Sequence, residues 1–141
     1  MSFGFSVGDF IAVAKLIKDI TICLKESGGA ASDYRELVGE LLDLQHVLNR
    51  IKNLEENAQN SESIKCLKVA ALDCKFVLDD FQKKLEPYDK SLRQSRDNGW
   101  MKRSVKSVKW ELTMKKDVDI LRAYLQAHRS SLNMRLALEG M

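Results

Sequence analysis

The chain has 141 residues, of which 45% are hydrophobic and 30% are charged, and its formal net charge is +3. This length suits one domain with a single core, and the composition excludes an intrinsically disordered chain. The chain has a single proline and almost no alternating β-branched runs, so we expect an all-α fold. Three cysteines without a tight C-x-x-C spacing fit a reducing compartment better than disulfides or a metal site.

The first twenty residues are unusually apolar and predict a helix over about residues 6–27. Ser6 is placed to cap this helix, with Asp9 in its first turn. Charged residues interrupt the segment too often for a membrane span, and no basic residue precedes its apolar core as in a secretory signal. Ile11 and Ile22 fall in the charged arc of the helix. The predicted apolar arc contains Val7, Phe10, Val13, Ala14, Leu16, Ile17, Ile20, Cys23 and Leu24.

A second helix is predicted over about residues 32–54, after a stop at Gly28-Gly29. Its apolar residues alternate at spacings of four and three, which is a heptad seam over two repeats. The polar stretch that follows, residues 53–63, predicts a loop. The seam consists of Leu37, Leu41, Leu44, Leu48 and Ile51.

A third helix is predicted over about residues 62–96, with a longer seam that passes through Pro87. A proline inside a helix removes one hydrogen bond and kinks the chain. Because the seam is unbroken across Pro87, one bent helix is favoured over two helices. Asp97-Asn98-Gly99 is a turn signal that ends the segment. The seam contains Ile64, Leu67, Ala71, Cys74, Leu78, Phe81, Leu85, Tyr88 and Leu92.

A fourth helix is predicted over about residues 101–138, where two seams are out of phase between Leu112 and Met114. This slip predicts a kink or a short break near Thr113. The whole chain, residues 1–141, is therefore expected to be one up-down four-helix bundle with kinked third and fourth helices. Central seam positions on three helices are expected in the core, namely Leu41, Leu44, Leu78 and Leu121.

Charge is unevenly distributed along the chain. Residues 1–82 hold nine basic and thirteen acidic side chains, whereas residues 83–116 hold eleven basic and four acidic ones. One interpretation of the basic block is a solvated surface that balances the acidic second helix. The other is a patch for anionic lipid, to which each basic residue contributes roughly 1 kcal/mol. The expected patch consists of Lys102, Arg103, Lys106, Lys109, Lys115 and Lys116.

Residue patterns typical of catalysis are missing, and we expect neither an enzyme nor a bound cofactor or metal. His46 and His128 lie on different predicted helices without an H-E-x-x-H pattern, and no glycine-rich phosphate loop occurs. His128 falls on a seam, where a partly buried histidine with a satisfied ring is expected. Glu36, Glu40 and Asp43 share one helix face, which is usually solvated. Trp100 and Trp110 accompany the basic block, but no nucleic-acid motif does, so a nucleic-acid partner is not expected.

Two segments resemble the N-terminal helical domains of fungal NLR-like (NOD-like, STAND) proteins. They are SFGFSVGDFIAVAKLIKDI at the start and VKWELTMKKDVDILRAYLQAHRSSLNMRL near the end. The second is the more specific, with Lys109-Trp110, Lys115-Lys116 and a seam that includes His128. HeLo and HeLo-like domains, the helical bundle of the mixed-lineage kinase domain-like pseudokinase, and plant resistance-protein coiled-coil domains are similar in outline.

The resemblance implies a module for programmed cell death, heterokaryon incompatibility or innate immunity that is activated by oligomerisation. Self-association, anionic membrane lipid and a downstream nucleotide-binding module are the partners it implies. The protein would be cytoplasmic and recruited to the plasma membrane through its N-terminal helix. The alternative is a protein–protein interaction or homo-oligomerisation module that never contacts lipid. In either case the expected contact residues are Phe3, Phe5, Phe10, Ile11, Ile17 and Ile22.

Overall fold

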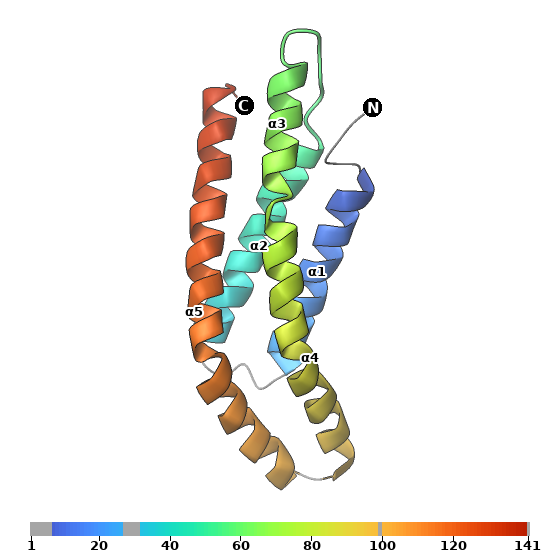
Figure 1. The fold of residues 1–141 in the computed structure, drawn as a ribbon, viewed down its shortest axis with the longest axis vertical. Coiled ribbons are helices and arrows are strands. Elements are labelled where there is room, and N and C mark those ends of the chain that lie inside the picture. Colours follow the sequence, from blue (N-terminus) through green and yellow to red (C-terminus); the bar gives the residue numbers. More distant parts are fainter. Residues whose placement is uncertain (1–6, 27–31, 99, 141) are drawn as a thin grey trace.

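The computed structural model describes the backbone of residues 7–26, 32–98 and 100–140, and the side chains of residues 7–25, 34–86 and 115–140. This part of the chain is helical and contains no strand, which confirms the predicted all-α class. Its helices, drawn in Figure 1, are α1 (Val7–Glu26), α2 (Ser32–Lys52), α3 (Ser61–Ala71), α4 (Cys74–Asn98) and α5 (Trp100–Leu138).

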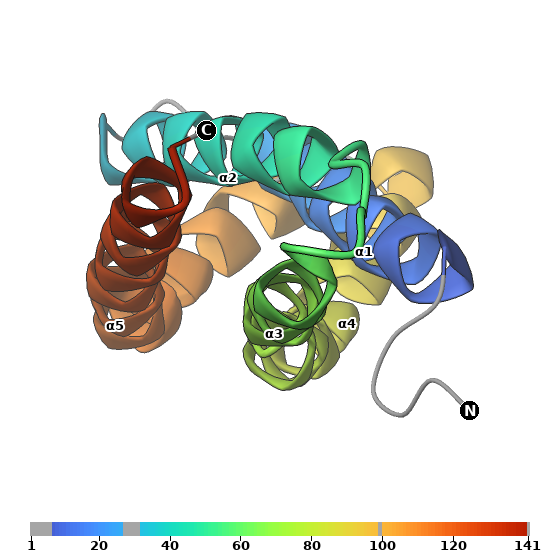
Figure 2. The same cartoon turned by 90° about the horizontal axis from the view of Figure 1, so that it is seen from above.

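The helices form four rods, because α3 and α4 follow one another along a single line (Figure 1). Successive rods alternate in direction, as predicted for an up-down bundle. The main contacts join α1 to α2, α2 to α5, α5 to α4 and α4 to α1. Viewed from above, α1 and α2 make one layer, and the α3–α4 rod and α5 make the other (Figure 2). As a result α2 and α5 are parallel neighbours, and so are α1 and α4.

One core fills the space between the rods and is built from the predicted seams. Leu41, Leu44 and Leu78 are fully buried and Leu121 is 2% exposed, so the predicted core positions are confirmed. Their convergence is expected, because a helix with one apolar stripe must bury it against other helices. Among the described side chains of α5, the buried residues are Val118, Leu121, Leu125, Leu132 and Leu136.

The third rod differs from the predicted single helix, because it is broken at Leu72 and Asp73. The N–H of Lys75 donates to the carbonyl of Leu72 at 3.0 Å, one residue later than in a regular α-helix. The break allows three closely spaced residues, Ala71, Leu72 and Cys74, to be buried together. By contrast α4 continues through Pro87, as predicted for a bent helix.

The loop between α2 and α3 covers residues 53–60 and is shorter than the predicted 53–63. The Asn57 side-chain oxygen accepts hydrogen bonds from the N–H groups of Gln59 and Asn60 at 2.9 and 3.0 Å. Asparagine commonly folds a loop in this way, and here it places the start of α3 at Ser61. Helix α5 is continuous, so its two out-of-phase seams correspond to a bend, visible in Figure 1, and to no break.

Candidate functional surfaces

The expected contact residues on the N-terminal helix α1 fall into two groups, one buried and one exposed. Phe10 and Ile17 are buried, with 5% and 2% of their surfaces exposed, and both belong to the core. Ile11 and Ile22 lie on the outer face and are 60% and 40% exposed. Contact through Ile11 and Ile22 therefore needs no rearrangement, whereas contact through Phe10 or Ile17 requires α1 to leave the bundle. Phe3 and Phe5 lie outside the described residues.

The rest of the predicted apolar arc of α1 is buried or, at Ala14 and Leu16, half-buried, except at its first residue. Val7 was expected on that arc but is 65% exposed, because it occupies the open first turn of the helix. An ion pair between Asp9 and Lys75, with nitrogen and oxygen 4.0 Å apart, connects α1 to α4. The two side chains are 43% and 39% exposed, so water screens the pair and it adds little to stability. Apolar burial is therefore the main force that retains α1 in the bundle.

Only the end of the expected basic patch falls within the described side chains. Lys115 and Lys116 are exposed on α5, whereas Lys102, Arg103, Lys106 and Lys109 lie outside the described side chains. The backbone that carries these four residues belongs to the first part of α5. In Figure 1 this part of α5 and the last part of α4 extend together beyond the ends of α1 and α2. The backbone positions that carry most of the block are thus at one end of the molecule.

On the acidic face of α2, Glu36 and Asp43 are 55% and 62% exposed, as expected of a solvated face, whereas Glu40 is only 14% exposed. Glu36 forms an ion pair with Arg122, and Glu40 accepts a hydrogen bond from Gln126 at 2.8 Å. One further arginine, Arg129, lies 3.2 Å from a Glu40 oxygen and 2.8 Å from an Asp43 oxygen. Each acidic residue precedes a core residue of α2, so the polar contacts run alongside the buried seam.

A polar junction forms at the break in the third rod. The Nε2 atom of His128 lies 3.2 Å from the carbonyl oxygen of Ala71, and the thiol of Cys74 donates to the same oxygen at 3.4 Å. Tyr124 stacks on the imidazole, with ring centroids 5.6 Å apart and planes 10° from parallel. His128 is therefore partly buried with a satisfied ring, as predicted. The contacts assign it a structural role in joining α5 to α3.

Several large apolar side chains are exposed at positions that the sequence did not single out. Phe76 on α4 is 81% exposed, and α5 exposes Ile120, Met134 and Leu138 by 58%, 66% and 80%. Single exposed apolar residues are common on protein surfaces. These four residues nevertheless provide apolar contact area on α4 and α5, which are helices other than the N-terminal one.

The described residues include no cluster of three or more potential metal ligands. In the same part of the chain, no helix is both long enough and apolar enough to cross a bilayer. The three cysteines form no disulfide with one another, and Cys23 and Cys74 are buried whereas Cys66 is exposed. No family model, curated protein or solved structure matches the chain.

Proposed function

We propose that this chain is a non-enzymatic N-terminal effector domain of a fungal NLR-like protein. In this proposal it signals cell death by oligomerising and by targeting a membrane through α1. One observation supports the proposal most strongly: α1 exposes Ile11 and Ile22 on its outer face while it buries a wide apolar arc against the bundle. The exposed isoleucines contact lipid first, and the buried arc contacts it only after α1 has left the bundle.

The free energy of burial limits how α1 can act. Five of its large side chains are buried, namely Phe10, Val13, Ile17, Ile20 and Leu24. Each contributes about 1.5–3 kcal/mol, so exposing all of them to water costs about 8–15 kcal/mol. This is comparable to the whole stability of a typical domain, about 5–15 kcal/mol. Release of α1 must therefore be coupled to its transfer into another apolar environment, either a bilayer or a neighbouring subunit.

The geometry of binding follows from the charges on α1. Lys15, Lys18 and Asp19 interrupt its sequence, so the helix is better suited to the membrane surface than to the bilayer interior. An amphipathic helix of this kind lies in the plane of the headgroups with its apolar face buried. The basic residues at the end of the bundle attract anionic headgroups, and this attraction weakens as salt screens the charges.

Liposome co-sedimentation tests the role of α1. We expect the protein to bind vesicles that contain anionic lipid more strongly than zwitterionic vesicles. Ile11→Glu should weaken binding while leaving the melting temperature nearly unchanged, because Ile11 is exposed. Ile120→Glu is the matched control, since Ile120 on α5 is 58% exposed, close to the 60% of Ile11. Equal effects of the two variants would contradict a specific role of α1.

Charge reversal tests the basic patch in the same assay. The triple variant Lys102→Glu, Arg103→Glu and Lys106→Glu should abolish binding to anionic vesicles without unfolding the protein. The control triple variant changes the net charge equally but elsewhere, near the opposite end of the bundle. It consists of Arg50→Glu, Lys52→Glu and Lys65→Glu. If both triple variants bind as the parent does, the membrane proposal fails.

A second candidate function is a protein–protein interaction module that never contacts lipid. The exposed apolar side chains on α4 and α5 favour it, above all Phe76 with 81% of its surface exposed. Sedimentation velocity distinguishes the two candidates. The interaction module would be supported if the parent protein binds no vesicles but self-associates. In that case Phe76→Ser should abolish the association.

A further inference from the structure

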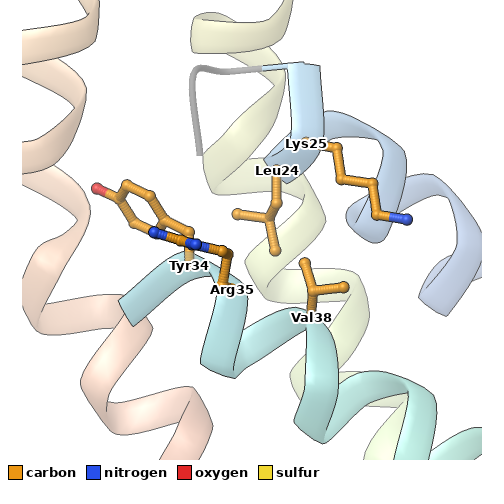
Figure 3. Close-up of a pocket in the computed structure, with 5 residues that line it drawn as sticks. All are labelled: Leu24, Lys25, Tyr34, Arg35 and Val38. Carbon is orange, nitrogen blue, oxygen red and sulfur yellow. The ribbon is translucent and has the colours of Figure 1, made fainter. Parts of the chain in front are cut away.

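A small apolar cavity lies where the end of α1 meets the start of α2. Its volume is about 100 Å³, and it is lined by Leu24, Lys25, Tyr34, Arg35 and Val38. Figure 3 shows Leu24 and Val38 pointing toward each other from α1 and α2, with the longer side chains of Lys25 and Arg35 extending to opposite sides of them. Leu24 and Tyr34 are 1% and 5% exposed, so the inner wall belongs to the packed core.

The lining combines two kinds of chemistry. Leu24 and Val38 offer apolar surface, and Lys25 and Arg35 add long side chains that each end in a cation. Ligand sites are commonly apolar cavities with a few polar groups that fix orientation. Among the described lining residues, both charged groups are cations, and both bind carboxylate and phosphate groups well. An alkyl chain with an anionic head matches this lining, whereas a cationic or purely polar ligand does not.

We propose that the cavity between α1 and α2 binds the end of a short, unbranched alkyl chain that carries an anionic headgroup. The chain occupies the space between Leu24 and Val38, and the headgroup lies outside, within reach of Lys25 or Arg35. This site differs from the proposed membrane surface, because it takes single amphiphile molecules from solution.

The size of the cavity limits the length of chain that it holds. An apolar protein cavity of about 150 Å³ accommodates benzene, which has six carbons. By proportion, a cavity of about 100 Å³ holds about four carbons. Each buried methylene should strengthen binding about fourfold until the cavity is full, after which further methylenes remain in water and add nothing.

A chain-length series of alkyl phosphates, from propyl to octyl, tests the proposal below the concentrations at which they form micelles. Binding is followed through the methyl NMR signals of Leu24 and Val38 in the full chain. We expect saturable shifts whose affinity rises about fourfold per carbon and levels off near about four carbons. Inorganic phosphate, which lacks the chain, should give no shift, and butanol, which lacks the charge, should bind more weakly than butyl phosphate. Butanoate should bind as well, since the cations accept either head.

Variants at Val38 test the cavity itself. Val38→Ala enlarges the cavity and should move the plateau to a longer chain, whereas Val38→Phe fills it and should abolish the shifts. Val47→Phe is the matched control, because Val47 is a half-buried valine on the same helix that does not line the cavity. Melting temperatures of all three variants show whether each remains folded.

Removal of the charges provides an independent test of the headgroup contact. The double variant Lys25→Gln and Arg35→Gln should weaken butyl phosphate binding about two- to fivefold at low salt and should weaken butanol binding less. Lys18→Gln is the control on α1. The proposal is overturned if no probe gives a saturable shift, or if affinity rises steadily to octyl phosphate and Val38→Phe behaves as Val47→Phe does.

Discussion

The Nε2 atom of His128 lies 3.2 Å from the carbonyl oxygen of Ala71, at the point where the third rod of the bundle is broken. In a regular helix this carbonyl would accept the N–H of Lys75, but that N–H is bonded to Leu72. A buried carbonyl without a partner is costly. His128 and the thiol of Cys74 supply the missing donors. The freed carbonyl lies on α3 and its two donors lie on α5 and α4, so three helices meet at the break.

The environment of His128 predicts how stability depends on pH. Burial lowers the pKa of its imidazole, and the charge of Arg135 lowers it further, while the Ala71 carbonyl and the Asp73 carboxylate act in the opposite direction. The unfolded chain therefore binds a proton more readily than the folded chain around and below pH 6.5. The contribution of His128 to the free energy of unfolding is complete above this pH and is lost as pH falls toward the folded-state pKa.

Urea unfolding between about pH 7.5 and about pH 5 checks this prediction. His128→Gln retains a side-chain N–H that can donate to Ala71 but does not titrate, so its stability should fall less with acidification than that of the parent. His46→Gln is the control, because His46 is exposed on α2. A constant stability difference between parent and His128→Gln across this range would contradict the prediction.

The loss of stability on leucine-to-alanine substitution should depend on how deeply each leucine is buried. Leu44→Ala and Leu78→Ala should each destabilise the protein by about 2–5 kcal/mol, because both side chains are fully buried and truncation leaves a cavity. Leu42→Ala, in the same helix as Leu44 but 46% exposed, should change stability by no more than about 0.5 kcal/mol. Melting curves of the three variants test this ranking, and similar values for Leu42 and Leu44 would refute the register of α2.

The thiols should differ sharply in reactivity. Burial is the main cause that raises the pKa of Cys74 to about 12, so the thiolate that reacts is scarce at neutral pH. Cys23 is also buried, whereas Cys66 is exposed. Titration of the native protein with a thiol reagent should show one fast group, and Cys66→Ser should remove it. Fast labelling of Cys74 in that variant would show that the α3–α4 junction opens readily.

The two ion pairs that Arg129 forms with α2 should differ in coupling energy. The Glu40 side chain is 14% exposed and that of Asp43 is 62% exposed, so water screens the second pair far more. Double-mutant cycles with alanine should give the larger coupling energy for the less exposed ion pair of Arg129 with Glu40, about 0.5–3 kcal/mol. For Arg129 with Asp43 we expect about 0.2–1 kcal/mol, which should decline at high salt. Equal couplings would mean that exposure does not decide the strength of these pairs.

The sequence by itself determined the class of the fold and most of its core. Spacings of three and four residues placed Leu41, Leu44, Leu78 and Leu121 inside, because a helix can bury only one stripe and repeats it at this period. The same reasoning placed Ile11 and Ile22 outside, and both are exposed. These are properties of one helix at a time, so a single sequence contains them.

The break at Leu72 and Asp73 was decided only by tertiary structure. The seam keeps its phase from Ala71 to Cys74, so the apolar pattern carries no sign of the interruption. Tertiary packing makes it favourable, because the break buries Leu72 and α5 provides His128 for the freed carbonyl. The pairing of Arg129 with Glu40 and Asp43 has a similar origin. It depends on α2 and α5 being parallel neighbours, and a periodic pattern within each helix does not specify which other helix lies beside it.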